Sequence, residues 1–298
     1  MAAQRTVAEV AVVVNQDAGK AARQMVTLRK MTRKHKVKLV MSDGADLDYT
    51  IRKALEDKRT KRLIIGGGDG SVSTAASLVL RLRPDVEIAV LPLGTANYYA
   101  KSLGLTKNLP AAFETAFKGK TEKRHLCRAN NREFLIGVNI GVTSKMFDEL
   151  TDEEKSRVGR LAYFRGILRV IMSVQPPDIQ IEVDGQLTPC ASTELVVVNQ
   201  DVKEFIKLVP EVQATEPYFE IVTYGLGKNK LSPLFAVLMF AVTFGKNQKY
   251  LKRIKATKAT IYTGKPQPVS IDGDVLATTP VEIELIQEPI TFVRTISK

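Results

Sequence analysis

The 298-residue sequence contains only two cysteines and two histidines. Cys127 and Cys190 lie far apart, with no CxxC pair and no Cys/His cluster, so neither a disulfide framework nor a structural zinc site is indicated. This cysteine usage favours a reducing cytoplasm. Hydrophobic residues make up 44% of the chain, which is enough to fill a core in each of the roughly two domains that this length predicts.

Long hydrophobic runs are also missing. The longest nearly uninterrupted apolar run covers residues 234–244, about half of the roughly 20 residues that a helix needs to span a bilayer. Residues 1–9 contain no apolar segment ahead of a small-residue cleavage site, so no secretory signal is expected. The sequence therefore favours a cytoplasmic protein without a membrane-spanning helix.

Acidic residues are too few to balance the basic ones. The chain has 44 lysines and arginines against 32 aspartates and glutamates, a net charge of +12. This excess favours polyanionic partners such as nucleic acid, nucleotide or anionic lipid headgroups. No helix-turn-helix pattern and no aromatic-basic RNA-binding pattern is present, so no nucleic-acid partner is expected.

Short apolar runs alternate with amphipathic stretches from Thr6 to about Lys118, a pattern typical of βαβ units. The helix predicted over residues 72–82 has apolar residues at helical spacing and Pro84 just past its end. The expected strands are rich in Val, Ile and Leu, as buried parallel strands are. They cover residues 7–14, 37–41, 62–65 and 87–91.

The hydrophobic period changes to two after about His125, which predicts a mainly antiparallel β domain. Asp184-Gly185 predicts a tight hairpin. A capping box at Thr151 and Glu154 predicts a helix to about Met172, and an apolar helix is expected over 233–244. The expected strands cover residues 134–140, 179–183, 194–198, 219–224, 259–262, 269–272, 281–286 and 290–293.

Three unusual turns follow the first, third and fourth predicted strands: residues 15–20 (NQDAGK), 66–71 (GGGDGS) and 92–97 (PLGTAN). Ligands of open parallel sheets bind beyond the carboxyl ends of the strands. Glycines let the backbone approach an anion closely, and the following helix offers free N–H groups. Asp69 would repel a phosphate there unless a divalent cation or a transferable proton mediates. The alternative is that these turns merely permit tight packing.

The motifs GGGDG and PLGTAN together resemble the catalytic domain of the diacylglycerol kinase and sphingosine kinase superfamily, including its bacterial soluble lipid kinases. NQDAGK is similar to the family's NPxSGK turn, residues 159–163 to its second-domain helix, and residues 270–274 (SIDGD) to its DGE motif. The resemblance covers nearly the whole chain. GGDG alone also occurs in NAD kinases and phosphofructokinases, but PLGTAN is the lipid-kinase form, and no Asn-Asp-Glu triplet of the NAD kinases is present.

The resemblance implies a fold and an activity. It implies an N-terminal α/β nucleotide-binding domain with a parallel sheet over residues 1–125, of the NAD kinase and diacylglycerol kinase type. It also implies a C-terminal antiparallel β-sandwich domain over 126–298, with the active site in the cleft between the two. The last strand, about 288–298, either completes the second domain or returns to the first. Members transfer the γ-phosphate of ATP to a lipid hydroxyl with Mg²⁺.

The family's site residues can be carried over position by position. Asp69 and Asp272 are the implied catalytic residues, Asp69 holding Mg²⁺ through water and Asp272 accepting the proton of the lipid hydroxyl. Asp274 replaces the family's glutamate and is implied in metal or nucleotide binding. The alternative for Asp272 is a structural Asp-Gly hairpin like that at Asp184. The nucleotide-binding set is Asn15, Lys20, Ser42, Gly67, Gly68, Asp69, Gly70, Thr95, Asn97 and Asp274.

Three departures from the family pattern concern acidic groups. Tyr98 follows Asn97 where an aspartate is usual, and His125 stands where several bacterial members have an aspartate. Residues 210–217 resemble a degenerate form of a stretch that holds a structural magnesium. These departures support a second hypothesis, a catalytically weak relative that binds nucleotide and anionic lipid. A kinase for a soluble hydroxyl compound is a third.

A lipid substrate implies peripheral contact with an anionic membrane surface. Bases cluster after the apolar helix over 233–244, an arrangement that suits such a surface; the alternative is a core helix followed by a solvated basic loop. The acceptor is diacylglycerol-like, phosphatidylglycerol-like or sphingoid, and the sequence predicts neither which one nor the oligomeric state. The clustered bases are Lys246, Lys249, Lys252, Arg253, Lys255 and Lys258, with Arg157, Arg160, Arg165 and Arg169 on the earlier helix.

Overall fold

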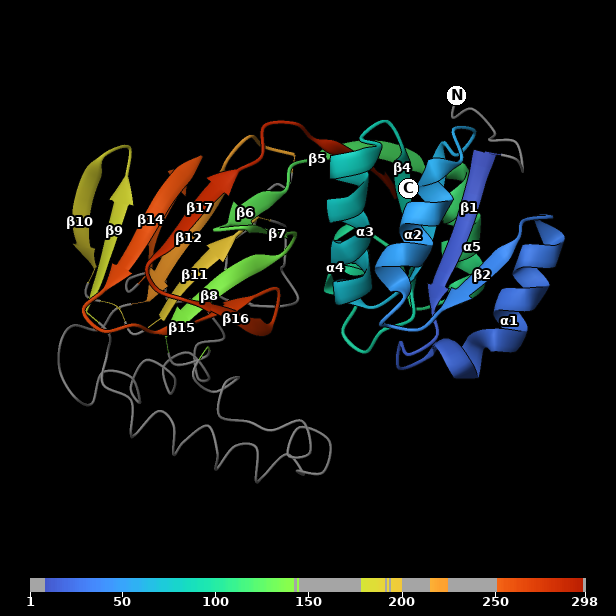
Figure 1. Cartoon of the computed structure of the whole chain (residues 1–298), viewed down its shortest axis with the longest axis horizontal. Coiled ribbons are helices and arrows are strands. Elements are labelled where there is room, and N and C mark those ends of the chain that lie inside the picture. The colour runs from blue at the N-terminus through green and yellow to red at the C-terminus, as the bar shows by residue number, and fades with distance from the viewer. Residues whose placement is uncertain are drawn as a thin grey trace, which may run out of the picture. The chain divides into compact units, whose positions relative to one another are not determined.

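The computed structural model describes residues 9–141, 144, 178–190, 192, 194–199, 215–224 and 251–296. These residues form two compact units. The first comprises residues 9–126, 215–216 and 286–296, and the second comprises the remainder (Figure 1). The expected fold class is confirmed, with an α/β unit built on a parallel sheet and an antiparallel β-sandwich. No helix of the described residues has the length and apolar character needed to cross a bilayer.

The sheet of the first unit has six strands in the order β2-β1-β3-β4-β18-β5. Its parallel part consists of β2 (Leu39–Ser42), β1 (Val10–Asn15), β3 (Arg62–Gly67) and β4 (Glu87–Pro92). The strand β18 (Ile290–Arg294) runs parallel to β4 and antiparallel to β5 (Lys120–Arg124). The C-terminal segment of the chain is therefore an internal strand of the first sheet.

Five helices pack on this sheet. Leu28 and Met31 of α1 share one apolar core with Phe113 of α5 and with alternate residues of β1, while α2 packs against α3. Asn108 caps α5 by accepting a hydrogen bond from the Ala111 N–H at 3.1 Å. The helix bounds are α1 Ala21–Lys34, α2 Leu47–Glu56, α3 Asp69–Leu82, α4 Tyr98–Ser102 and α5 Leu109–Lys118.

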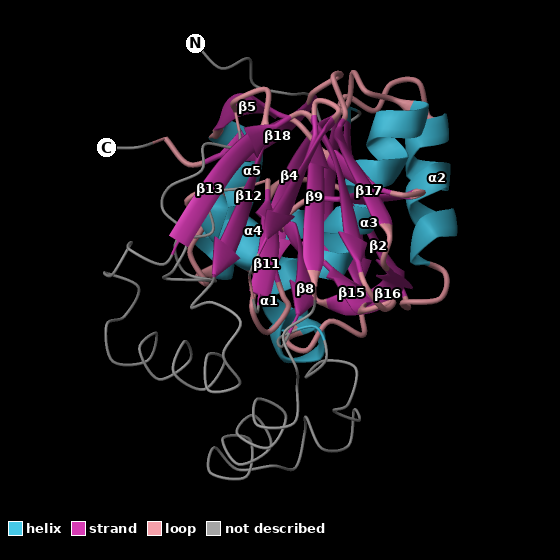
Figure 2. Cartoon of the chain, turned by 90° about the vertical axis from the view of Figure 1, so that its left-hand side faces the viewer, coloured by secondary structure: helices cyan, strands magenta, loops and turns pink. Residues whose placement is uncertain are grey.

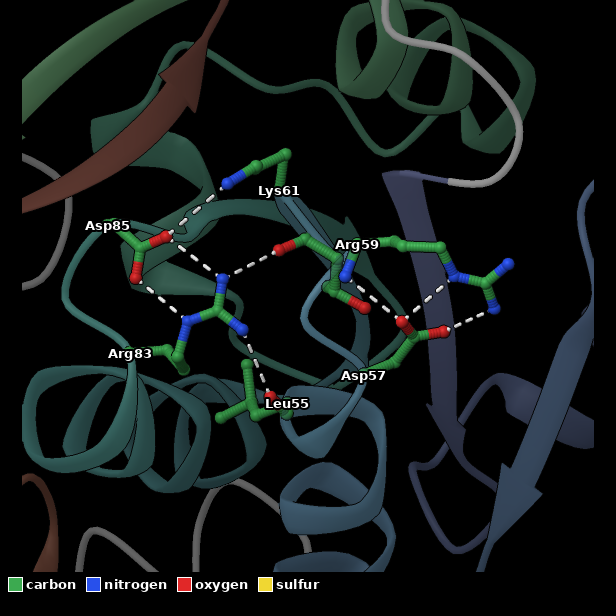
Figure 3. Close-up of polar contacts among 7 residues, drawn as sticks. Leu55, Asp57, Arg59, Lys61, Arg83 and Asp85 are labelled. Atoms are coloured by element: carbon green, nitrogen blue, oxygen red, sulfur yellow. Dashed lines mark hydrogen bonds and ion pairs between the residues drawn. The ribbon is translucent and has the colours of Figure 1, made fainter.

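A charged cluster ties the loops at the edge where β3 and β4 begin (Figure 3). Arg83, just past α3, donates to the carbonyl oxygens of Leu55 (3.2 Å) and Thr60 (3.1 Å) and to Asp85 (2.9 Å). Nearby, hydrogen bonds from Arg59 lower the pKa of Asp57 to about 2. The cluster lies at the opposite end of the strands from the glycine-rich turns, so it supports the sheet without reaching the candidate site.

In the described part of the second unit, the elements are the strands β6 to β17, several of which are labelled in Figure 2. They form two sheets, ordered β10-β9-β14-β17-β6-β7 and β13-β12-β11-β8-β15-β16. Their inner faces bury one apolar core that includes Phe134, Val197 and Ile261. The bounds are β6 Cys127–Ala129, β7 Arg132–Phe134, β8 Gly137–Gly141, β9 Ile179–Val183, β10 Gln186–Cys190, β11 Glu194–Val198, β12 Phe219–Tyr224, β13 Leu251–Ala256, β14 Lys258–Thr263, β15 Pro268–Ile271, β16 Asp274–Thr278 and β17 Val281–Leu285.

Two expectations from the sequence are wrong in detail. The strand expected over 134–140 is two strands, because the chain leaves one sheet after Phe134 and enters the other at Gly137. Lys252, Arg253 and Lys255 lie on strand β13 and not in a basic loop. The basic composition of β13 hid its strand character, although Arg253 pairs with the buried Glu220 of the neighbouring strand.

Several sequence predictions fall outside the described residues. They are the helices expected over 151–172 and 233–244, the motif at 159–163, most of the stretch 210–217, and the bases Arg157, Arg160, Arg165, Arg169, Lys246 and Lys249.

Candidate functional site

The three predicted turns meet at one edge of the first sheet. The strands β1, β3 and β4 are adjacent and parallel, with Val14 opposite Gly66 and Gly67 opposite Pro92, so their carboxyl ends lie side by side. Hydrogen bonds join the turns directly. The Lys20 N–H donates to the Leu93 carbonyl at 2.9 Å, the Gly94 N–H donates to the Gly67 carbonyl at 3.1 Å, and the Asn15 side chain donates to the Ser71 hydroxyl at 3.1 Å.

The glycines of these turns have two different roles. A Cβ on Gly67 would lie 2.4 Å from the Ser71 side chain, and one on Gly94 would lie 2.4 Å from the Gly68 Cα. Gly70 is exposed, and a Cβ there would meet nothing within 4 Å. Gly67 is thus required for the tight fold of its own turn over Ser71, and Gly94 is required for the close approach of the PLGTAN turn to Gly68. The open space at Gly70 leaves the start of α3 accessible.

Asp69 is the first residue of α3, and its side chain reaches the neighbouring turn. Its Oδ1 accepts a hydrogen bond from the Tyr99 N–H at 2.8 Å, in the first turn of α4. The first N–H groups of a helix have no partner within that helix, so Asp69 satisfies one of these groups in α4. The carboxylate therefore links the GGGDG turn to the first turn of α4, which directly follows PLGTAN, and remains half-buried beside the accessible start of α3.

Asn97 closes the PLGTAN turn on itself. It has a left-handed backbone (φ 52°) and a side chain that is nearly fully buried. Its Oδ1 accepts from the Gly94 N–H at 2.9 Å, and its Nδ2 donates to the Gly94 carbonyl at 2.7 Å. Thr95, in contrast, is exposed. Of the two predicted side-chain donors, Thr95 is exposed and Asn97 holds the turn.

A fourth loop, after β2, adjoins these turns. The Asp17 carboxylate accepts a hydrogen bond from the Gly44 N–H at 2.6 Å, and the Gln16 N–H donates to the Ser42 carbonyl at 2.8 Å. The buried Ser42 hydroxyl accepts a hydrogen bond from Thr50 at 3.0 Å. The sequence reasoning missed Asp17. The available signal was an aspartate two residues after Asn15, where its own N–H donates to the Asn15 side chain.

Asp272 and Asp274 form a separate group in the second unit, at the hairpin between β15 and β16. Asp272 and Gly273 both have positive φ, 50° and 104°, and Ile271 pairs with Asp274, the geometry of a two-residue hairpin turn. Asp274 is exposed, and its carboxylate forms no hydrogen bond or ion pair with any described residue.

The Asp272 carboxylate binds three consecutive backbone amides. Its Oδ1 accepts from the Ile136 N–H (2.8 Å) and the Gly137 N–H (3.1 Å), and its Oδ2 accepts from the Leu135 N–H (3.0 Å). These amides belong to the segment in which the chain crosses from one sheet to the other. This contact explains why the expected strand over 134–140 is interrupted, because three of its amides bond to a side chain and not to a neighbouring strand.

Three further residues named from the sequence have structural contacts. A ring nitrogen of His125 lies 3.0 Å from the Ile286 carbonyl, and the Lys101 ammonium lies over the Tyr98 ring at 5.1 Å. Burial, assisted by the Asp272 charge, raises the pKa of the Cys127 thiol well above its ordinary value, so this cysteine is not a nucleophile. Among the residues that the structure describes, no three His, Cys, Asp or Glu side chains are grouped to hold a metal.

The arrangement at the first sheet fits a nucleotide with its metal ion. Mg²⁺ is commonly held by one or two carboxylates together with substrate phosphates, and Asp69 provides one carboxylate beside the accessible helix start. An exposed helix N-terminus behind glycines suits a phosphate group.

Comparisons with known proteins agree with this geometry. Residues 9–129 match the model of the diacylglycerol kinase catalytic domain, and residues 137–294 match that of the YegS C-terminal NAD kinase beta sandwich-like domain. A diacylglycerol kinase of Staphylococcus carnosus is 24% identical over 234 residues, covering 78% of this chain and 75% of that protein. An uncharacterized Synechocystis protein is 24% identical over 77% of this chain, but the match spans only 54% of its length.

A solved structure supports the fold. The crystal structure of a diacylglycerol kinase from Bacillus anthracis superimposes with a TM-score of 0.73 at 22% identity, covering 96% of this chain and 97% of that one. The two family matches together extend over both units of the chain. The chain belongs to the diacylglycerol kinase family of lipid kinases.

Proposed function

We propose that this protein transfers the γ-phosphate of ATP to a lipid hydroxyl with Mg²⁺. The observation that carries the proposal is the position of Asp69, whose carboxylate stands at the accessible start of α3 and is fixed by the Tyr99 N–H at 2.8 Å. Phosphoryl transfer depends mainly on positioning and on neutralising charge. A fixed carboxylate beside free helix N–H groups provides both.

The residues of the turns at the first sheet have different parts in this proposal. The backbone N–H groups of Gly68 and Gly70 hold phosphate oxygens, and Asp69 orients the metal, which neutralises the charge on the phosphates when bound. Thr95, exposed at the same edge, donates to the nucleotide. Asn97 acts through the backbone of Gly94 as a positioning residue, and Asn15, Lys20 and Ser42 support the adjoining turns.

The second unit supplies the proposed acceptor chemistry. Asp272 accepts the proton of the lipid hydroxyl, and Asp274 contributes to metal or nucleotide binding. Domain boundaries near residue 126 and a cytoplasmic location with peripheral membrane contact belong to the same proposal. The acceptor is a diacylglycerol-like, phosphatidylglycerol-like or sphingoid lipid.

A second candidate is a nucleotide- and lipid-binding relative of low turnover. One observation in its favour is that the Asp272 carboxylate already accepts hydrogen bonds from three backbone amides. The other is that Tyr98 stands where the family pattern has an aspartate. In this case Asp272 is a purely structural residue, and ATP binds without efficient transfer.

The test is Mg²⁺-dependent transfer of labelled γ-phosphate from ATP to a panel of lipids in mixed micelles, with NAD as a soluble acceptor. Asp69→Asn retains an oxygen acceptor for the Tyr99 N–H but removes the charge, so we expect intact folding and a loss of activity of about 100-fold or more. Asp48→Asn, on the surface of α2, makes the same charge change and should retain activity.

The outcomes separate the candidates. A labelled lipid that is lost with Asp69→Asn and retained with Asp48→Asn supports the kinase and identifies its acceptor class. ATP binding by calorimetry without labelled lipid favours the low-turnover relative. Phosphorylation of NAD alone would overturn the lipid proposal.

A further inference from the structure

Helix α1 and the segment that follows it have an unusual charge composition. Between Asp17 and Asp43 the chain contains eight lysines and arginines and no aspartate or glutamate. The helix has no acidic residue in its first turn and two basic residues in its last. Helix α1 and the residues next to it therefore contribute a large part of the chain's excess positive charge.

The bases of α1 lie on the side of the helix that faces solvent. Arg23, Arg29, Lys30 and Arg33 are exposed, at spacings that place them on one face, while Leu28 and Met31 are buried in the core. Val26 lies within the same stripe and is 82% exposed. We name these five residues, Arg23, Val26, Arg29, Lys30 and Arg33, the α1 cationic face.

No acidic side chain of the described residues forms an ion pair with the four bases of this face. Lys34, at its border, pairs with Glu114 of α5, a carboxylate that also binds Lys118. The adjacent helix α2 differs, because Arg52 pairs with Asp48 and Lys53 pairs with Glu56. The charges of α2 are largely balanced, whereas those of the α1 cationic face are not.

We propose that the α1 cationic face docks on an anionic membrane surface. A row of unbalanced bases attracts anionic headgroups, and an exposed valine among them can enter the boundary between headgroups and acyl chains. The proposal rests on the proposed function, in which the substrate is a lipid in a bilayer. A membrane is favoured over nucleic acid because an exposed apolar side chain at the centre of the stripe gains nothing from a phosphate backbone.

The test compares two fourfold variants of the full chain that change the net charge equally. The first is Arg23→Gln, Arg29→Gln, Lys30→Gln and Arg33→Gln on the α1 cationic face. The matched control is Arg52→Gln, Lys53→Gln, Lys58→Gln and Arg59→Gln, on α2 and the loop after it, where all four side chains are exposed. Binding is measured by co-sedimentation with vesicles of equal parts phosphatidylglycerol and phosphatidylcholine, without ATP.

We expect the first variant to bind the anionic vesicles at least about tenfold more weakly, since each base near such a surface adds to the attraction, and the control to bind like the unmodified protein. Val26→Ser should weaken binding less. Added salt should weaken binding of the unmodified protein. Unchanged circular dichroism and ATP affinity of the variants show that the fold is intact.

The proposal fails if the α1 variant retains vesicle binding, or if both fourfold variants lose it equally. Tighter binding to a duplex oligonucleotide than to vesicles, lost in the same variant, would overturn the membrane as the partner. Vesicle binding that depends on the α1 cationic face, together with no phosphorylation of any lipid, would leave this surface standing and overturn the proposed function alone.

Discussion

The second unit contains two Asp-Gly hairpins that are alike in backbone and different in side-chain contacts. Asp184 and Gly185 have φ of 52° and 76°, and Asp272 and Gly273 have φ of 50° and 104°. Both turns join adjacent antiparallel strands with two residues. Only the Asp272 carboxylate reaches back to bind the amides of residues 135–137.

The two hairpins show that an Asp-Gly dipeptide determines the backbone of the turn but not the contacts of the aspartate side chain. Asp and Gly tolerate a left-handed backbone, and this property alone explains both turns. The distinguishing contact of Asp272 depends on a segment more than a hundred residues away in the sequence. A motif match at Asp272 therefore identifies a turn, and the surrounding structure decides what the carboxylate does.

The largest expected effect is on stability. Asp272→Ala leaves three amides of the buried crossing segment without their acceptor, and an unsatisfied buried donor costs about 1–3 kcal/mol. We expect the free energy of unfolding to fall by about 3 kcal/mol more than with Asp184→Ala. Both variants bear the same cost of an alanine at positive φ, so their difference isolates the carboxylate contact. Urea denaturation measures it, and equal losses would contradict the assigned contact.

The next expected effect concerns turnover. Asp272→Asn retains the left-handed turn and one acceptor oxygen, but it cannot accept a proton as a carboxylate does. If Asp272 is the general base, kcat for lipid phosphorylation falls about 100-fold or more with little change in the KM for ATP, while Asp184→Asn leaves both constants unchanged. An equal loss in turnover and ATP affinity would indicate a binding role for Asp272. Unchanged turnover would indicate a structural residue.

A smaller loss of stability, equal in the two turns, is expected when Gly185 or Gly273 is replaced by alanine. Neither Gly185 nor Gly273 has an atom within 4 Å of an added Cβ, so Gly→Ala in each turn costs only the backbone strain of a left-handed alanine, about 1 kcal/mol. Thermal unfolding of the two variants should shift by similar amounts. A markedly larger shift for Gly273→Ala would mean that the backbone, and not the Asp272 side chain, distinguishes the turns.

The smallest effect on stability is expected at the residue after each Asp-Gly pair. Gln186 and Asp274 occupy equivalent, exposed positions, so Asp274→Gln makes the two turns alike in sequence at little cost, within about 0.5 kcal/mol. If Asp274 contributes to metal binding, this variant requires more Mg²⁺ for half-maximal activity. An unchanged Mg²⁺ requirement would remove Asp274 from the proposed site.

The sequence predicts the fold class because hydrophobic period and strand composition are local properties. The β-branched runs of β1 and β3 and the apolar spacing of α3 are visible residue by residue. The strand β13 is not, because its lysines and arginine obscure the alternation until the partner Glu220 is known. The interruption between β7 and β8 is likewise invisible, since it depends on Asp272.

The candidate site is predictable to the same degree. The meeting of the three turns follows from parallel strand order, and Gly67, Gly70 and Asp69 stand where the motifs place them. The roles within the turns do not follow, because they depend on non-local distances. The Asn97 side chain is engaged by the backbone of Gly94. Asp17 joins two loops, and no spacing in the sequence shows that these loops are close in space.

The strand β18 has a consequence for synthesis of the protein. It lies between β4 and β5, yet the second unit precedes it in the chain and is synthesised first. During translation the nascent first unit therefore carries unpaired strand edges at β4 and β5, which are a risk for aggregation until β18 is synthesised. Premature termination near residue 285 would yield a product with this gap in its sheet, and such a fragment is a natural substrate for chaperones and proteases.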